Sequence, residues 1–170
     1  MENSIKLNIA VLTVSDTRKK TTDKSGKILN KLIKERKHKV IKYSICKDDI
    51  YDIRSIVSEW IADNKIQVVI TTGGTGVSGR DGTPEAVDPL FDKKIEGFGE
   101  IFRYISYKKI KTSSIQSRSL AGVANGTYIF CLPGSPSACK DAWENIIVHQ
   151  LNSNNKPCNL VELIPSLKKK

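Results

Sequence analysis

Short apolar runs alternate with amphipathic stretches through the first half of the chain. The runs 7–14, 39–45 and 68–72 predict strands, and the first and third are apolar enough to be buried on both faces. The stretches 28–33 and 53–61 repeat apolar residues every three or four positions, as amphipathic helices do. Strand and helix alternating in this way predict an α/β fold with a mostly parallel sheet covered on both faces.

The second half of the chain is less regular. Residues 98–107 have a helical pattern, and Asn125-Gly126 separates two apolar segments, 122–124 and 127–132. Asn-Gly between such segments is a strong hairpin signal, so we expect an antiparallel pair at one edge of the sheet. A final amphipathic helix is expected over 137–151, and the last dozen residues are expected to be extended.

These elements fit a single domain. The chain has 170 residues, enough for one core, and shows no internal repeat or interdomain linker. We place the domain at 6–151 and a C-terminal extension at 152–170, whose basic tail, Lys168–Lys170, is expected to be disordered. No apolar run is long enough to span a membrane, and the N-terminus lacks a secretory pattern. Four cysteines without metal-site spacing fit reduced thiols, so we expect a cytoplasmic protein without membrane partners.

The net charge of +10 raises the hypothesis of nucleic-acid binding. Of the 28 basic residues, 22 are Lys, whereas recognition of base edges relies mainly on Arg. No nucleic-acid-binding motif accompanies the charge, so we expect a solvated basic surface and no nucleic-acid partner.

The strongest chemical signal follows the third predicted strand. Gly73-Gly74-Thr75-Gly76 ends the strand, Asp81 comes five residues later, and Thr83-Pro84 opens a helix with Thr83 as the expected N-cap. Glycines allow backbone N–H groups to approach a ligand closely, and a helix start favours anions. A carboxylate in a phosphate site implies a cation between them, so Asp81 predicts a divalent metal, most simply Mg²⁺.

Three loops are expected to meet at this site, because ligands of open parallel sheets bind beyond the carboxyl ends of the strands. Ser15 follows the first strand and Asp48 the second, while Arg80 and Asp81 follow the third. Asp48 and Asp81 can then share the metal over phosphates, with Arg80 adding positive charge. Asp48 also has a plainer explanation, as a carboxylate that favours the start of the next helix.

Other classes fit less well. Gly74-x-Gly76-x-x-Gly79 matches a dinucleotide fingerprint, but it follows the third strand instead of the first. The chain has neither a P-loop motif nor a G-x-S-x-G elbow. His38 and His149 have no zinc-ligand spacing and are expected at the surface. A glycine turn without a ligand remains an alternative, although it leaves the polar cluster unexplained.

These residues resemble a known family. The segments 72–76 and 83–86, with Asp81 between them, look like the signature of the molybdopterin-binding domain, and 117–123 and 132–136 match its two later motifs. The resemblance runs from Lys6 to about Leu151. Within the family, which includes MoaB and MogA, the segments 142–147 and 157–159 are similar to the MoaB branch.

The resemblance implies a three-layer α/β/α fold and assembly as a trimer or hexamer. It further implies transfer of AMP from Mg-ATP to the terminal phosphate of molybdopterin, with Asp48 and Asp81 holding Mg²⁺. The remaining positions that it carries over are nucleotide or phosphate contacts (Gly73, Gly74, Thr75, Gly76, Arg80, Gly134 and Ser135) and pterin contacts (Ser15, Thr75, Ser117 and Arg118).

Two departures bear on activity. Active adenylyltransferases of the family commonly carry Pro-Arg-Asp where this chain has Gly79-Arg80-Asp81. They also carry a Lys where this chain has Ser137, which removes one cation from the nucleotide side. A protein that binds or carries molybdopterin without chemistry is therefore the alternative function.

Overall fold

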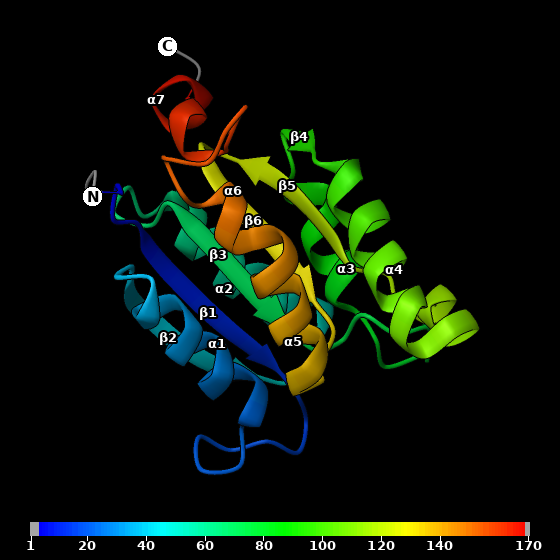
Figure 1. Cartoon of the computed structure of the whole chain (residues 1–170). Helices are drawn as coiled ribbons and strands as arrows, with labels where there is room; N and C mark the ends of the chain where they lie inside the picture. Colours follow the sequence, from blue (N-terminus) through cyan, green and yellow to red (C-terminus); the bar gives the residue numbers. More distant parts are fainter. Residues whose placement is uncertain (1–3, 169–170) are drawn as a thin grey trace.

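A six-stranded sheet separates two layers of helices (Figure 1). This computed structural model describes residues 4–168, and its strand order is β2-β1-β3-β6-β5-β4. β1, β2, β3 and β6 run parallel, while β5 lies antiparallel between β6 and β4. The strands are β1 (Asn8–Val14), β2 (Lys39–Cys46), β3 (Val68–Thr72), β4 (Lys93–Lys94), β5 (Leu120–Ala124) and β6 (Thr127–Leu132).

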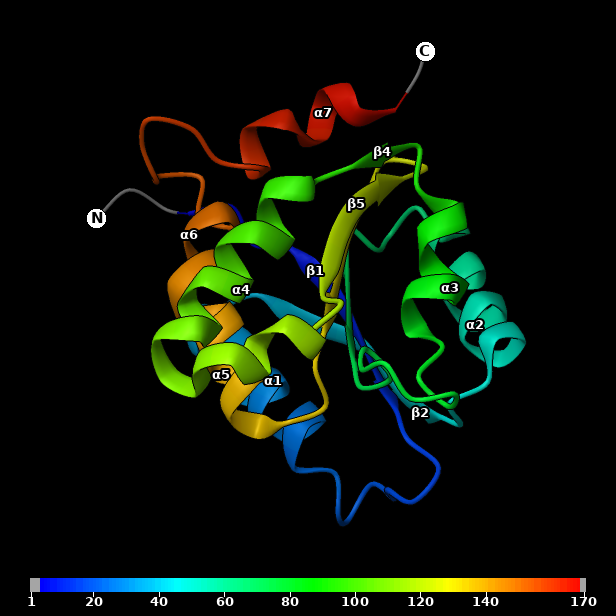
Figure 2. The same cartoon turned by 90° about the vertical axis from the view of Figure 1, so that its right-hand side faces the viewer.

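The helices form the two outer layers (Figure 2). One face of the sheet is covered by α1 (Lys24–Glu35), α4 (Glu96–Ile110), α5 (Pro136–Ala142) and α6 (Val148–Gln150). The other face is covered by α2 (Ile50–Ala62) and α3 (Thr83–Val87). This confirms the predicted α/β fold with its mostly parallel sheet and antiparallel edge pair.

Each helical layer has its own core because the side chains of a strand alternate between faces. In β1, Ile9 and Val11 belong to the core beneath α1, while Ala10 and Leu12 belong to the core beneath α2. All four side chains are fully buried. Burial on both faces explains why β1 and β3 read as continuous apolar runs.

The final helix begins and ends within one residue of its expected bounds, but a π-helical segment, Trp143–Ile147, joins α5 to α6. The expectation that the last dozen residues are extended was wrong. A 3₁₀ turn at Val161–Leu163 leads directly into α7 (Ile164–Leu167). Val161 is buried, and Ile164 and Leu167 pack on the same core. These apolar residues are three positions apart, and a helical segment places residues at that spacing on one face.

Two further polar residues bear on the expectations. His38 is buried, contrary to its expected surface position, and its Nδ1 accepts a hydrogen bond from the N–H of Leu7 at 3.1 Å. Burial lowers the pKa of His38, which favours the neutral ring that this bond requires. Lys168 of the expected basic tail contacts Asn64, while Lys169 and Lys170 lie outside the described residues.

The topology brings the loops after β1, β2, β3 and β6 to one rim, because the four parallel strands all end there. Across residues 4–168, no helix is long and apolar enough to cross a membrane.

Candidate functional site

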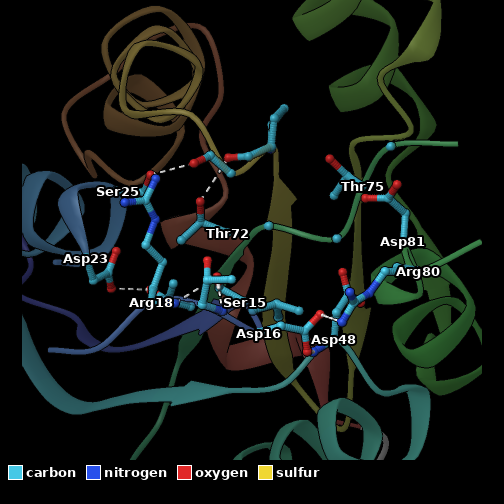
Figure 3. Close-up of a pocket in the computed structure, with 18 of the residues that line it drawn as sticks. Ser15, Asp16, Arg18, Asp23, Ser25, Asp48, Thr72, Thr75, Arg80 and Asp81 are labelled. Atoms are coloured by element: carbon cyan, nitrogen blue, oxygen red, sulfur yellow. Dashed lines mark hydrogen bonds and ion pairs between the residues drawn. The ribbon is translucent and has the colours of Figure 1, made fainter. Parts of the chain in front are cut away.

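A cleft of about 550 Å³ opens at this rim, between the loops that follow the parallel strands (Figure 3). It brings together most of the residues that the sequence predicted for a phosphate site. Those that line it are Ser15, Asp48, Gly73, Gly74, Thr75, Gly76, Arg80, Asp81, Ser117 and Gly134. Ser135 and Arg118 do not line it.

The carbonyl groups of the glycine loop, Gly73–Gly76, accept hydrogen bonds from Thr83 and Arg118. Thr83 donates twice: its hydroxyl to the Gly73 oxygen at 2.8 Å and its N–H to the Gly74 oxygen at 3.0 Å. Arg118 also donates twice, from its N–H to the Thr75 oxygen at 3.0 Å and from Nε to the Gly76 oxygen at 2.6 Å. All four carbonyl oxygens of the loop are therefore occupied by protein donors.

The role of Thr83 corrects one expectation. Gly82, not Thr83, is the N-cap of α3, and within the described part of the chain no side chain forms a capping hydrogen bond to that helix. The buried Thr83 hydroxyl is instead used on the glycine loop, because the tight turn brings the Gly73 carbonyl to it.

The turn itself depends on glycine. Gly73 and Gly74 have φ angles of +108° and +64°, in the region that side chains rarely adopt. A Cβ on Gly74 would lie 2.4 Å from Thr83 Oγ1 and 2.8 Å from both carboxylate oxygens of Asp48. Among residues 4–168, no acceptor is hydrogen-bonded to the N–H groups of Gly74 and Thr75. Successive free N–H groups in such a turn form a cradle for an anion.

Asp48 belongs to the cleft and not to the helix that follows it. The cap of α2 is Asp49, whose carboxylate accepts from the N–H groups of Tyr51 and Asp52 at 2.9 and 3.0 Å. Asp48 Oδ1 accepts from the Gly82 N–H at 3.1 Å. Partial burial, followed by the nearby charges of Asp81 and Asp16, raises the pKa of Asp48.

Asp81 has the opposite environment. Hydrogen bonds from the hydroxyl and N–H of Ser78, and from the N–H of Gly76, lower its pKa. A Cβ on Gly76 would lie 2.8 Å from Asp81 Oδ2, so the Asp81 carboxylate packs directly against the glycine loop. The two acids, which come from separate loops, therefore lie at one cleft, as the sequence predicted.

Arg80 joins two of these loops. It forms an ion pair with Asp16, whose other carboxylate oxygen accepts from the Asp48 N–H at 3.4 Å. The Arg80 side chain is 76% exposed, so the guanidinium lies at the mouth of the cleft (Figure 3). Its pairing with Asp16 leaves it within reach of a ligand in the cleft.

The loop after β6 completes the rim. Gly134 lines the cleft, and its oxygen accepts from the Ser25 hydroxyl at 2.7 Å. The Ser135 hydroxyl is the N-cap of α5 and accepts from the Ala138 N–H at 3.2 Å. Ser135, which the family motif assigns to the nucleotide, thus caps a helix in this chain.

Sequence reasoning missed the part of the cleft near the start of α1. Asp23 lines it and accepts from the Gly26 N–H at 2.8 Å, from the Thr13 hydroxyl at 2.6 Å, and from Tyr43. Figure 3 shows Asp23 with Ser25 and Arg18 on the side of the cleft opposite Asp48 and Asp81. The available signal was Asp23 as an N-cap at the end of a polar loop that also follows β1.

A second cleft, of about 570 Å³, adjoins the first. The two clefts share Asp48, Arg80 and Asp81. The second also has Tyr51 and Arg118 in its lining. The acids therefore stand between two hollows, an arrangement that suits a reaction between two bound molecules.

The similarity of this chain to known proteins extends over all the residues that line the cleft. A family model described as "Probable molybdopterin binding domain" matches residues 10–153. The chain belongs to the molybdopterin-binding domain family. It is 50% identical over 165 residues to Molybdenum cofactor biosynthesis protein B of Escherichia coli (strain K12), covering 97% of this chain and 95% of that protein. The protein of the same name from Staphylococcus epidermidis is 45% identical over 150 residues, which are 86% of this chain and 85% of that one.

Solved structures of the family have the same fold. A crystal structure of Molybdenum cofactor biosynthesis protein B superposes with a TM-score of 0.88 at 38% identity, covering 98% of both chains. The tungsten cofactor synthesizing protein MoaB from Pyrococcus furiosus gives a TM-score of 0.79 at 30% identity, covering 96% of this chain and 98% of that one. The resemblance to the MoaB branch is therefore confirmed.

Proposed function

We propose that this chain acts in molybdenum cofactor biosynthesis and transfers AMP from Mg-ATP to the terminal phosphate of molybdopterin. In this reaction a phosphate oxygen of molybdopterin forms a bond to the α-phosphorus of ATP, and the bond to pyrophosphate breaks. The observation that carries the proposal is the pair Asp48 and Asp81 beside a glycine loop whose N–H groups at Gly74 and Thr75 are available to an anion.

The acid pair fits magnesium in its chemistry. Mg²⁺ in phosphate-transfer sites is held by one or two carboxylates together with substrate phosphates and water. Burial first, and then the nearby charges of Asp81 and Asp16, raise the pKa of Asp48, and a cation would relieve the repulsion between these charges. Asp48 and Asp81 would hold the ion, which when bound supplies positive charge to the phosphates.

The chain's own residues would bind and orient the two substrates. Phosphoryl-type transfer depends mainly on positioning and on neutralising developing charge, so no covalent nucleophile is needed. We assign the nucleotide phosphates to the glycine loop, Arg80 and Gly134, and the pterin side to Ser15 and Ser117, with Thr75 between them. Each of these residues lines the cleft.

The test is direct. Purified protein is incubated with molybdopterin, ATP and Mg²⁺, and the release of pyrophosphate is measured. We expect release that requires all three components. No release under conditions where an active relative works would exclude adenylyl transfer.

A carrier of molybdopterin without chemistry is the second candidate, and one observation favours it. Ser135 caps α5, and Ser137, two residues later, stands where active relatives carry a Lys. This function predicts retention of molybdopterin without ATP, and equal retention by the Asp81→Asn variant.

We also propose that the protein is a cytoplasmic homo-oligomer, a trimer or a hexamer. Ile101, Tyr104 and Tyr107 on α4 are each more than half exposed, which suits a helix face covered by another copy. Light scattering coupled to size exclusion would give three or six times the chain mass of 18.9 kDa. The mass of a single chain would exclude the proposed assembly.

A further inference from the structure

We infer that Arg118 is a positioning residue. It fixes the glycine loop and Asp81 through their backbone carbonyl groups and does not contact a substrate anion. The family resemblance places Arg118 near the pterin or its phosphate, but its contacts in this chain point to the protein itself. Its importance for catalysis rests on the proposed adenylyl transfer, whereas its structural role can be measured without it.

Each of the three guanidinium nitrogens of Arg118 donates to a protein acceptor. Nε donates to the Gly76 oxygen at 2.6 Å, and Nη2 donates to the Asp81 oxygen at 2.8 Å. Nη1 pairs with the carboxylate of Glu85, in the first turn of α3. The backbone N–H of Arg118 adds a bond to the Thr75 oxygen at 3.0 Å. One residue therefore holds both ends of the segment from Thr75 to Asp81.

The charge of Arg118 is also satisfied. Its hydrogen bond lowers the pKa of Glu85, which keeps that carboxylate ionised beside the guanidinium. The Arg118 side chain is about one third exposed. It lines the second cleft but not the cleft that holds Gly74 and Thr75. In the second cleft its guanidinium nitrogens already donate to Gly76, Asp81 and Glu85, and Arg118 acts on the first cleft only through the loop.

This arrangement has a consequence for the acid pair. With the carbonyls of Gly76 and Asp81 held by the guanidinium, the Asp81 carboxylate stays on the Ser78 hydroxyl and N–H. The next residue, Gly82, donates its N–H to the Asp48 carboxylate. Releasing Arg118 would free both carbonyls and loosen Asp81 and Asp48 together. A lysine cannot replace it, because a single ammonium group cannot form the same planar fork.

Hydrogen exchange of the full chain tests the role of Arg118 without ligand. The variants are Arg118→Lys, which keeps the charge, and Glu85→Gln, which removes the partner. Arg103→Lys is the matched control, because the one hydrogen bond of the Arg103 side chain within residues 4–168 is a 3.4 Å bond to the Ser119 oxygen, and Arg103 does not line either cleft. The readout is exchange in a peptide covering 76–83, compared with one covering β6.

We expect exchange in 76–83 to accelerate about tenfold or more in Arg118→Lys, since hydrogen bonds from a charged donor are lost. β6 should exchange as in the parent protein, and Arg103→Lys should change neither peptide. Glu85→Gln should show a smaller acceleration. The double variant should exchange little faster than Arg118→Lys, because the two residues act through one contact.

The kinetic arm distinguishes positioning from binding. If Arg118 positions the loop, Arg118→Lys should lower kcat about tenfold or more, with little change in the KM for molybdopterin. Unchanged exchange together with a raised KM at constant kcat would overturn the inference and make Arg118 a substrate contact. If the parent protein releases no pyrophosphate, the proposed function fails, while the exchange arm still decides the role of Arg118.

Discussion

The N–H of Gly82 donates to Asp48 Oδ1 at 3.1 Å, which joins the loop after β3 to the loop after β2. The bond places Asp48 beside the glycine loop, while its neighbour Asp49 caps α2. Two adjacent acids in the sequence thus serve two different purposes. This separation makes them a natural pair for testing the proposed metal site.

We expect Asp48→Asn to lower adenylyl transfer about a hundredfold or more, because the amide can still accept from Gly82 but no longer carries the charge a cation needs. Pyrophosphate release at saturating Mg²⁺ measures the effect. Asp49→Asn is the control, since Asn caps helices as well as Asp does. Equal activity of both variants would remove Asp48 from the metal site.

Gly74 offers a matched comparison with Gly79. A Cβ at Gly74 meets Thr83 and Asp48 at a φ of +64°, whereas a Cβ at Gly79 meets nothing within 4 Å. We expect Gly74→Ala to lower the free energy of unfolding by about 1–3 kcal/mol and to abolish activity. The strain of the backbone and the displacement of Thr83 and Asp48 both contribute to this loss. Gly79→Ala should change stability by less than about 0.5 kcal/mol. Urea unfolding gives both values, and a stable, active Gly74→Ala would show that the turn can be made without glycine.

The fold was largely predictable because each strand and helix carries a local pattern, such as the β-branched run of β3 or the apolar stripe of α2. The acid pair was predictable because parallel strands must end at one rim. The use of Thr83 on Gly73 was not, since the sequence marks Thr83 as a helix cap and only the tertiary turn brings the Gly73 carbonyl to its hydroxyl. Asp23 was missed for a similar reason: its donors Thr13 and Tyr43 come from different strands.

His38 predicts a pH dependence of stability. Its pKa in the folded chain lies below the ordinary value of 6.5 because burial disfavours the charged ring. The unfolded chain therefore binds the proton more readily. The contribution of neutral His38 to the free energy of unfolding is complete above about pH 6.5 and is lost as the pH falls through the lowered pKa of the folded chain. In urea unfolding, His38→Gln should be less stable than the parent at pH 8, with a gap that narrows toward pH 5. The exposed His149 is the control residue, and His149→Gln should leave the pH dependence unchanged. A gap for His38→Gln that stays constant with pH would contradict this explanation.

The C-terminal segment is expected to contribute to the stability of the whole chain. Val161 is only 2% exposed and belongs to the core beneath α1, and the Tyr128 hydroxyl donates to the Leu160 oxygen at 2.8 Å. Val161→Ala should therefore cost about 2 kcal/mol, from lost burial and the cavity left behind. Leu163→Ala, at a side chain that is half exposed two residues later, should cost clearly less. Equal and small losses in urea unfolding would mean that residues 152–168 pack too weakly to stabilise the domain, which would make them a dispensable extension.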